Sequence, residues 1–328
     1  MTRGRIAIIG AGGTLAMTRQ NGGLAPSRSA ADLVEGVRAR VADVELIPVD
    51  AFSRPSANLG FSDVSYLVQV VEEVVLQGTQ GVVITQGTDT IEETAFALEL
   101  MCTADVPIAI TGGMRGAMEP GADGPANLLG AIVAARGGSS RLGVMVVMND
   151  EVHAARYVSK AHTTSLSAFT SGDAGVLGRI EEGELRIGRE TLPRLAVGGG
   201  LDDRPWPRVA LVKIGMDDDG SLIDAVVAAG FSGCIVEAMG AGHVPASLVE
   251  RLEKLASRIP VVLASRTGRG RVCRETYGYP GSEMDLLGRN LIWSGALTGL
   301  KARVLMTICL HRAPNAPVEE FRRLVKLI

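Results

Sequence analysis

An alternation of short apolar runs with longer helical patterns constrains the fold of this chain more than any other feature. The apolar runs are rich in β-branched residues and occupy residues 5–10, 44–50, 81–87, 106–113 and 142–150. A strand that is apolar along its length is buried on both faces, as in a parallel sheet covered by helices. The helical patterns lie between the runs and span residues 29–41, 62–78, 90–102 and 126–136. The first two-thirds of the chain is therefore predicted to form a doubly wound α/β domain.

The alternation stops in a stretch with clusters of proline, glycine and aspartate, which covers residues 190–207. Strand and helix patterns then resume at residues 208–215, 221–230, 233–240, 247–256 and 260–265. A chain of 328 residues is long enough for two hydrophobic cores. We therefore predict an N-terminal domain of residues 1–189, a linker of residues 190–207 and a smaller C-terminal α/β domain of residues 208–328.

Charge and hydropathy narrow the range of partners. The formal net charge is −3 and the arginines are scattered, so there is no electrostatic basis for binding nucleic acid or acidic membranes. No apolar run approaches the roughly 20 residues of a membrane span. The apolar residues 6–9 are too few for the hydrophobic part of a secretion signal. We expect a cytoplasmic protein that binds neither nucleic acid nor membranes.

Cysteine and histidine spacing indicates neither a metal site nor a redox site. The four cysteines are far apart and form no C-x-x-C pair, so we expect reduced thiols in the core. The four histidines lack the spacing of ligand motifs such as H-E-x-x-H. The sequence therefore predicts no metal and no cofactor.

A glycine-rich loop, "GAGGTLA", follows the first predicted strand. Gly10 and Gly12 match the start of a dinucleotide-binding fingerprint, but Leu15 stands where the third glycine belongs. No helical pattern follows, and Asp50 lies farther along the chain than the ribose-binding acid of such a fold. A nicotinamide-dependent oxidoreductase is therefore a minor alternative. The other notable group of the loop is the hydroxyl of Thr14.

Polar residues gather where several predicted strands end, in residues 10–14, 85–90, 111–115 and 149–164. Ligands of doubly wound sheets bind outside the carboxyl ends of the strands. We therefore expect these four segments to approach one crevice, and we expect the functional site to lie there.

Thr88, Asp89 and Lys160 form a candidate catalytic set within these segments. A threonine hydroxyl is a poor nucleophile until a base accepts its proton. A partly buried lysine can lose its proton and act as that base, and a neighbouring aspartate would hold the lysine in place. Thr90 and Glu93 have the spacing of a capping box, which predicts that Thr90 caps the following helix.

With these residues in view, the chain resembles the bacterial L-asparaginases, a family of two-domain amidohydrolases. The resemblance is carried by "GGTLA", "TQGTDTIEETA", "ITGGMR", "ADGPANL", "VVMNDEVHAARYVSK" and "GALTGLKARV", in the family's order. It implies a larger flavodoxin-like N-terminal domain with a mostly parallel sheet, a smaller C-terminal α/β domain, and a homotetramer or homodimer with sites between subunits. It also implies hydrolysis of a small amino-acid amide, above all of L-asparagine to L-aspartate and ammonia.

The resemblance assigns catalytic roles to four residues. Thr14 corresponds to the nucleophile that attacks the side-chain amide, forms an acyl-enzyme and releases ammonia. Thr88, Asp89 and Lys160 correspond to the family's second catalytic group, and the Thr88 backbone N–H is a natural oxyanion donor. Glu283 corresponds to a glutamate of the adjoining subunit that binds the substrate amino group.

The substrate-binding positions implied by the resemblance depart from the family in several places. They fall on Gly60, Phe61, Ser62, Gly87, Asp89, His243 and Glu283. Phe61 and Ser62 stand where relatives grip the substrate carboxylate with a serine and a glutamine, and a phenylalanine side chain cannot donate a hydrogen bond. His243 stands where many relatives carry asparagine.

The loop after Thr14 also departs from the family pattern. Many relatives carry there a tyrosine that activates the nucleophile, whereas residues 17–33 contain none. Either Lys160 serves both threonines or a tyrosine comes from elsewhere. Tyr277 and Tyr279 are candidates, although tyrosines at half-buried turns more often only pack by their rings.

These departures leave open which amide is hydrolysed. Glutamine, D-asparagine and a substituted amide are alternatives to asparagine, because a missing binding donor shifts selectivity strongly. A non-catalytic amino-acid-binding protein on the same scaffold is a further alternative, since one fold can serve several functions.

Overall fold

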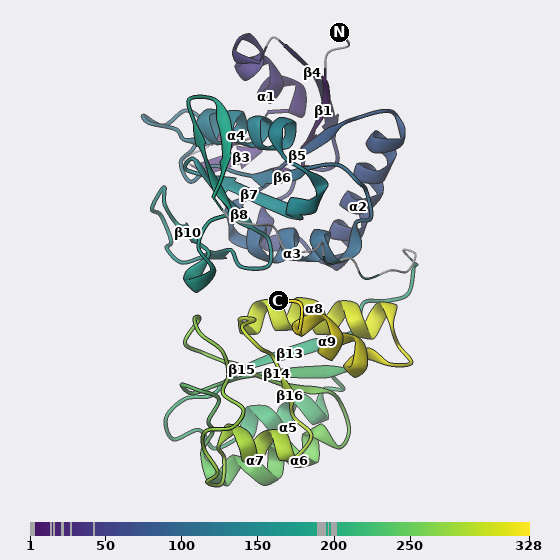
Figure 1. The fold of residues 1–328 in the computed structure, drawn as a ribbon, viewed down its shortest axis with the longest axis vertical. Coiled ribbons are helices and arrows are strands. Elements are labelled where there is room, and N and C mark those ends of the chain that lie inside the picture. The colour runs from purple at the N-terminus through teal and green to yellow at the C-terminus, as the bar shows by residue number, and fades with distance from the viewer. Residues whose placement is uncertain are drawn as a thin grey trace. The chain divides into compact units, whose positions relative to one another are not determined.

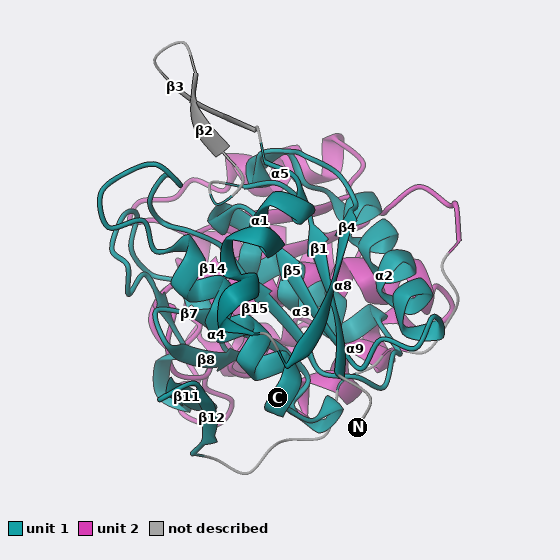
Figure 2. Cartoon of the chain, turned by 90° about the horizontal axis from the view of Figure 1, so that it is seen from above, with its two compact units in different colours: residues 1–196 teal, residues 197–328 magenta. Residues whose placement is uncertain are grey.

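The computed structural model of the chain describes residues 4–13, 15, 17–20, 23–26, 28–41, 43–188, 195, 197 and 202–328, with the backbone alone at residues 17–20 and 23–26. The chain divides into two compact units, residues 1–196 and residues 197–328 (Figure 2). Each unit has its own sheet and its own hydrophobic core. The division falls inside the segment that the sequence marks as a linker, and the finer domain bounds stay a prediction.

The first unit is built on a sheet of eight strands in its described part. The strands are β1 (Gly4–Gly10), β4 (Val44–Asp50), β5 (Gly81–Thr85), β6 (Ile108–Thr111), β7 (Val144–Met148), β8 (Glu151–Ala154), β11 (Gly178–Glu181) and β12 (Glu184–Ile187). They lie in the order β12-β11-β8-β7-β6-β5-β1-β4, parallel from β4 to β7 and antiparallel from β7 to β12. By position in the chain, the parallel strands are ordered 2-1-3-4-5, which is the flavodoxin-like arrangement. The predicted fold of this unit is confirmed.

Helices cover both faces of this sheet. The helix α1 (Ala30–Val37) packs beside α4 (Gly124–Gly137), and α2 (Phe61–Leu76) packs beside α3 (Ile91–Met101) on the opposite face (Figure 1). The helix α1 begins after Ser29, whose hydroxyl accepts the Asp32 N–H while the Asp32 carboxylate accepts the Ser29 N–H. This capping box satisfies two backbone donors at the helix start.

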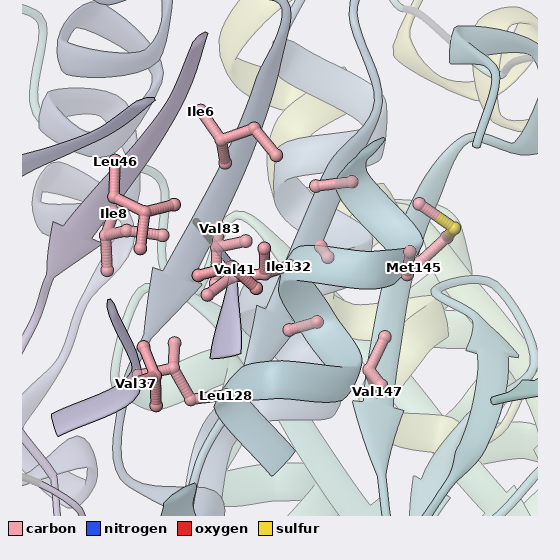
Figure 3. Packing of buried hydrophobic residues seen from close by; sticks show 14 of the residues in the cluster. Ile6, Ile8, Val37, Val41, Leu46, Val83, Leu128, Ile132, Met145 and Val147 are labelled. Carbon is pink, nitrogen blue, oxygen red and sulfur yellow. The ribbon is translucent and has the colours of Figure 1, made fainter. Parts of the chain in front are cut away.

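Figure 3 shows the core between this sheet and the helix layer of α1 and α4. Ile6 and Ile8 are two positions apart on β1, so both side chains point to the same face. They share the core with Val83 of β5 and with Leu128 and Ile132, which are one helical turn apart on α4. All five side chains are at most 2% exposed, and each burial contributes about 1.5–3 kcal/mol. This packing fixes β1 and β5, whose ends carry the candidate site.

The second unit contains a smaller sheet of parallel strands in the order β13-β14-β15-β16. Its strands are β13 (Val209–Lys213), β14 (Gly233–Ala238), β15 (Val261–Ser265) and β16 (Ile292–Trp293). Its helices are α5 (Ser221–Ala228), α6 (Val249–Ala256), α7 (Glu283–Gly288), α8 (Gly299–Arg312) and α9 (Pro317–Val325). The helices α8 and α9 cover one face and α5 and α6 the other (Figure 1), so the predicted smaller α/β domain is confirmed. Throughout the described chain, no helix combines the length and the apolar character needed to cross a membrane.

The glycine loop after β1 leads into a hairpin of β2 (Met17–Gln20) and β3 (Gly23–Pro26). A dinucleotide-binding fold requires a helix N-terminus at this point to hold the pyrophosphate. One oxygen of the Asp50 carboxylate, Oδ1, already accepts a 2.7 Å hydrogen bond from the Ala30 N–H. The structure therefore argues against the nicotinamide alternative.

Candidate active site

The candidate site lies at the carboxyl ends of β1 and β5. These neighbouring strands stand where the order of the parallel strands reverses, and doubly wound sheets open their ligand crevice at this point. The Ala11 N–H donates a 2.8 Å hydrogen bond to the Thr85 carbonyl and ties the two strand ends together. Strand order therefore brings the glycine loop beside the polar segment of residues 85–90.

Gly13 packs closely against the turn that follows β5. Its φ is +92°, and a Cβ at this position would overlap the backbone of Gln86 and Gly87. Only glycine combines this backbone conformation with so close an approach. The predicted nucleophile Thr14 lies outside the described residues. Its neighbour Gly13 places the glycine loop directly against the turn that carries Thr88.

Thr88, Asp89 and Lys160 come together in the structure. Lys160 Nζ donates one 2.9 Å hydrogen bond to Thr88 Oγ1 and another of 2.9 Å to Asp89 Oδ1. Thr88 is buried, the Lys160 side chain is 16% exposed and the Asp89 side chain is 64% exposed. The amine is thus held by a carboxylate and directed at a hydroxyl, while the carboxylate keeps a side open to solvent.

A short antiparallel pair positions Lys160. It consists of β9 (Ser159–Lys160) and β10 (Phe169–Thr170), in which Lys160 lies opposite Phe169. The Ala161 N–H donates a 2.7 Å hydrogen bond to the Ala168 carbonyl and continues the pairing. Strands of two residues carry no periodic signal, so the sequence does not predict this pair.

The arrangement contains the parts of a proton-transfer site. Asp89 orients the Lys160 amine, which lies at hydrogen-bond distance from the Thr88 hydroxyl, the arrangement that a base needs to activate that hydroxyl. A hydroxyl activated in this way attacks a carbonyl carbon itself or activates a bound water. The exposed side of Asp89 is available to a cationic group of a ligand.

Ser56 belongs to this site, although no sequence signal indicates it. Its hydroxyl donates a 3.4 Å hydrogen bond to Asp89 Oδ2 and accepts one of 3.2 Å from the Asp89 N–H. A Cβ on Gly87 would lie 2.5 Å from Ser56 Oγ, so the glycine allows the two segments to meet. Ser56 is 3% exposed. The buried serine therefore holds the turn that presents Thr88 and Asp89.

The predicted capping box at Thr90 is wrong. Thr90 precedes α3, but its side chain makes no capping hydrogen bond. Its hydroxyl instead donates a 3.0 Å bond to the Ser56 carbonyl and accepts one of 3.2 Å from Gln86 Nε2. Gln86 Nε2 also donates a 3.1 Å bond to the Thr94 hydroxyl. Tertiary hydrogen bonds thus replace the local cap. The side chains of Thr90 and Gln86 stabilise the turn through these bonds.

The residues predicted to grip a substrate carboxylate lie at the start of α2. Gly60 is the N-cap residue, and Phe61 and Ser62 begin the first turn. The Gly60 N–H donates a 2.9 Å hydrogen bond to Asp63 Oδ2, so the turn itself already uses this donor. Phe61 is half-buried and Ser62 is exposed. Ser62 is therefore the residue of this group with a side-chain donor open to solvent.

His243 and Glu283 lie together in the second unit. Glu283 is fully buried, and its Oε1 accepts 2.9 Å hydrogen bonds from the Thr276 and Tyr277 N–H groups. Its Oε2 lies 3.3 Å from His243 Nε2. On the other side of the ring, His243 Nδ1 lies 3.0 Å from the Tyr279 hydroxyl. A continuous line of polar contacts thus connects an exposed tyrosine with a buried carboxylate.

Aromatic packing holds the His243 ring in place. The Tyr277 and Tyr279 rings lie 4.8 Å and 5.5 Å from it between centroids, at interplanar angles of 83° and 65°. Edge-to-face contacts of this kind are favourable for aromatic rings. Both tyrosines therefore pack by their rings, and Tyr279 adds a hydrogen bond.

Glu283 is held in its ionised form. Burial raises the pKa of its carboxyl group, but hydrogen bonds from the Tyr277 and Thr276 N–H groups and the contact with His243 lower the pKa more. The net pKa lies below the usual value for glutamate. The second unit therefore contains a buried negative charge behind His243.

Neither metal ligands nor reactive thiols are part of these clusters. Among the residues that the structure describes, no group of three or more His, Cys, Asp or Glu side chains could hold a metal ion. All four cysteines are free, and three of them are buried as predicted, whereas Cys273 is half-buried. Burial raises the pKa of Cys234 and of Cys309 to about 12, so these thiols are unreactive near neutral pH.

Comparisons with known proteins agree with this fold. The fold is shared with amidohydrolases, which cleave amide C–N bonds. Residues 5–193 match the family described as "Asparaginase, N-terminal", and residues 208–324 match "Glutaminase/Asparaginase C-terminal domain". The chain belongs to the asparaginase family.

Individual relatives are similar over both units. The L-asparaginase of Bacillus licheniformis is 31% identical over 310 residues, which cover 93% of this chain and 95% of that protein. A probable L-asparaginase of Deinococcus radiodurans is 31% identical over 332 residues, covering 97% and 96% of the two chains. The crystal structure of a probable cytoplasmic L-asparaginase from Campylobacter jejuni superposes with a TM-score of 0.86 at 28% identity, covering 97% of this chain and 99% of that one.

Proposed function

We propose that this protein is an L-asparaginase, which hydrolyses L-asparagine to L-aspartate and ammonia through a threonine acyl-enzyme. One observation carries the proposal: Lys160 Nζ contacts both Thr88 Oγ1 and Asp89 Oδ1 at the switch point of a flavodoxin-like sheet. The names of the relatives support the choice of asparagine.

In the proposed reaction, the Thr14 hydroxyl attacks the carbon of the side-chain amide. The N–H of Thr88 stabilises the oxyanion, a contribution for which loss of one donor costs on the order of 100-fold or more. The proton of the Thr14 hydroxyl passes to the amide nitrogen, the C–N bond breaks, and the nitrogen leaves as ammonia. Thr88 and Lys160 then activate the water that releases aspartate from Thr14, while Asp89 orients Lys160. The packing of Gly13 against Gly87 brings the glycine loop, as far as Gly13, beside the turn that carries Thr88.

Recognition of the substrate is proposed to use both units. Asp89 offers an exposed carboxylate to the ammonium group, and Gly60, Phe61, Ser62 and Gly87 line the carboxylate end of the substrate. His243 and Glu283 are proposed to come from an adjoining subunit of a homotetramer or homodimer. Light scattering of the purified protein tests this assembly, and a monomer at working concentration would contradict it.

The residues proposed to bind the substrate carboxylate decide whether asparagine or another amide is preferred. Phe61 has no side-chain donor, and Ser62 is the exposed hydroxyl beside it. A site without one donor discriminates differently among amides, because a polar group of the ligand then stays unpaired. Glutamine, D-asparagine and a substituted amide are therefore the alternative substrates, and a non-catalytic amino-acid-binding protein is the alternative without chemistry.

Ammonia release from L-asparagine, L-glutamine and D-asparagine tests the proposal. We expect turnover of L-asparagine, and we expect Thr14→Ala, Thr88→Val and Lys160→Met each to lower kcat roughly 100-fold or more. Full activity in these variants would show that the roles are assigned wrongly. A thermal shift with aspartate but no turnover of any amide would favour the binding protein.

We also propose that the protein is cytoplasmic. The similar Campylobacter jejuni protein, a probable cytoplasmic L-asparaginase, supports this location. Fractionation of the host cell tests it, and recovery of the protein in the periplasmic or secreted fraction would contradict it.

A further inference from the structure

An arginine lies at the start of α2, where the substrate carboxylate is proposed to bind. Arg54 Nη1 donates a 2.6 Å hydrogen bond to Asp63 Oδ1, and Asp63 Oδ2 accepts the Gly60 N–H at 2.9 Å. Gly60 is the N-cap residue of α2, and Asp63 lies in its first turn. The Asp63 carboxylate therefore holds the Arg54 guanidinium beside the N-terminus of this helix.

The backbone of Arg54 packs against the glycine loop. A Cβ on Gly12 would lie 2.5 Å from the Arg54 carbonyl oxygen and 2.7 Å from the Arg54 backbone nitrogen, and the φ of Gly12 is +84°. Only glycine combines this conformation with so close an approach. The segment that carries Arg54 is therefore tied to the loop that leads to the proposed nucleophile.

The Arg54 side chain keeps donors for a ligand. Within the described residues its one hydrogen bond goes from Nη1 to Asp63, although a guanidinium has several further N–H groups. The Arg54 side chain is 54% exposed. Its guanidinium carbon lies 5.7 Å from the centre of the Phe52 ring, a cation–π contact that limits its movement. Asp63 and Phe52 thus hold a guanidinium that still has N–H groups to donate.

Charges of opposite sign flank Ser56. Arg54 precedes Ser56 by two positions, and the Ser56 hydroxyl contacts Asp89 through its Oδ2 and its N–H at 3.4 Å and 3.2 Å. An α-amino acid carries an ammonium group and a carboxylate on the same carbon. The exposed carboxylate of Asp89 suits the ammonium group, and the guanidinium of Arg54 suits the carboxylate.

We propose that Arg54 binds the α-carboxylate of the substrate and makes the enzyme specific for amides that have one. Nε and Nη2 form the second edge of its guanidinium, and two N–H groups on one edge match the two oxygens of a carboxylate. Arg54 thus supplies the donors that Phe61 lacks, next to the hydroxyl of Ser62. The inference rests on the proposed function, because that function places the substrate carboxylate at the start of α2.

The pairing with Asp63 decides how the carboxylate is attracted. Asp63 compensates the charge of Arg54, so directed hydrogen bonds contribute more than net charge. The N-terminus of α2, a helix of 16 residues, adds a partial positive charge. Arg54 is therefore a specificity-determining residue that acts on binding, and the proton transfers stay with the catalytic set at Thr88.

Hydrolysis of two amides that differ in the α-carboxylate provides the first test. β-Alaninamide is L-asparagine without this group. For Arg54→Met we expect KM for L-asparagine to rise roughly 30-fold and kcat to change far less, because the contact is the same in ground and transition state. The kcat/KM for β-alaninamide should stay within about threefold of wild type, since this amide has nothing for Arg54 to bind. Equal losses for the two amides would indicate a merely structural role and overturn the inference.

Two further variants sharpen this test. Arg136→Met removes another half-exposed arginine of the first unit, whose Nη1 lies 2.7 Å from Asp43 Oδ2, and it should have wild-type kinetics. Arg54→Lys keeps the charge but not the planar edge, so its KM for L-asparagine should lie between those of wild type and Arg54→Met. The same loss in Arg136→Met as in Arg54→Met would overturn the specific role of Arg54.

Calorimetry with L-aspartate and β-alanine provides a test that does not depend on turnover. β-Alanine is L-aspartate without its α-carboxylate. Arg54→Met should weaken the binding of L-aspartate roughly 30-fold and leave that of β-alanine within about twofold. An unchanged affinity for L-aspartate would overturn the inference.

The two tests separate the inference from the proposed function. If the wild type binds L-aspartate through Arg54 but hydrolyses no amide, the proposed function fails and the role of Arg54 stands. If the wild type hydrolyses L-asparagine and Arg54→Met keeps the wild-type KM, the proposed function stands and the role of Arg54 fails. A wild type that neither binds L-aspartate nor hydrolyses an amide would overturn both.

Discussion

Lys160 Nζ lies 2.9 Å from Thr88 Oγ1, although 72 positions separate the two residues in the chain. The contact joins a lysine on a two-residue strand to a threonine in the turn after β5. Asp89 accepts a second hydrogen bond from the same amine, so the amine has a fixed direction. The side chain that contacts Thr88 thus comes from a distant segment, in which the sequence indicates the lysine but not the short strand that positions it.

Lysine 160 is expected to act as a base and not only as a positive charge. Lys160→Arg keeps the charge and a partner for Asp89, but a guanidinium does not lose its proton. Both Lys160→Arg and Lys160→Met should therefore lower kcat for ammonia release roughly 100-fold or more. Lys254→Met, at an exposed position of α6, should have wild-type kinetics. Near-normal kcat in Lys160→Arg would show that charge alone suffices.

Ser56 is expected to hold the turn of Thr88 and Asp89. Ser56→Ala removes the acceptor of the Asp89 N–H and the donor to Asp89 Oδ2. Loss of such a hydrogen bond costs about 1 kcal/mol, so we expect kcat/KM for asparagine to fall roughly fivefold. Ser257→Ala, which removes an exposed hydroxyl bonded only to the nearby Lys254 carbonyl in the described structure, is the matched control. Equal kinetics in the two variants would remove Ser56 from the site.

Gly13 is expected to tolerate no side chain. Gly13→Ala adds a Cβ that overlaps the backbone of Gln86 and Gly87, so the loop must move away from the turn of Thr88. A displacement of about 1 Å near the reacting atoms costs on the order of 100-fold in kcat. Gly183→Ala is the control, because Gly183 also has a positive φ, +76°, but a Cβ there meets nothing within 4 Å. Retained activity in Gly13→Ala would contradict the close approach of the two segments.

The pH dependence of stability is expected to report on His153. Burial lowers the pKa of His153 to about 4 from its usual 6.5, while Glu151 raises it and Arg179 lowers it to a smaller extent. Between these two values the unfolded chain binds the proton and the folded chain does not, so the free energy of unfolding falls as pH falls from 6.5 to 4. Over this pH range the free energy of unfolding falls by roughly 3 kcal/mol.

Urea unfolding of wild type and His153→Gln at pH 4.5, 5.5 and 7 checks this prediction. The variant lacks the titrating ring. The free energy of unfolding of the wild type minus that of the variant should therefore decrease as the pH falls. The comparison also cancels the titration of carboxylates that both proteins share. A difference that is independent of pH would contradict the expected behaviour of His153.

The layers of the fold could be predicted because their signals are local. Runs that are apolar throughout must be buried on both faces, which places strands such as β1 and β5 in the interior of a parallel sheet. The capping box of Ser29 and Asp32 also lies within four consecutive residues. The short strands β9 and β10 were missed, because two residues carry no periodicity. The cap at Thr90 was predicted wrongly, because a tertiary partner, Ser56, took its hydroxyl.

The sequence by itself determined the order of strands and helices, the family, and which residue types are present for the chemistry. The sequence also grouped Lys160 with Thr88, 72 positions away, whereas only the tertiary structure decided that Ser56 meets Asp89 across 33 positions and that Tyr279 meets His243 across 36. Backbone preferences and burial act over a few neighbouring residues, so a single sequence carries them. A hydrogen bond between distant segments depends on how both are packed, and it exists only once the sheet has brought their ends together.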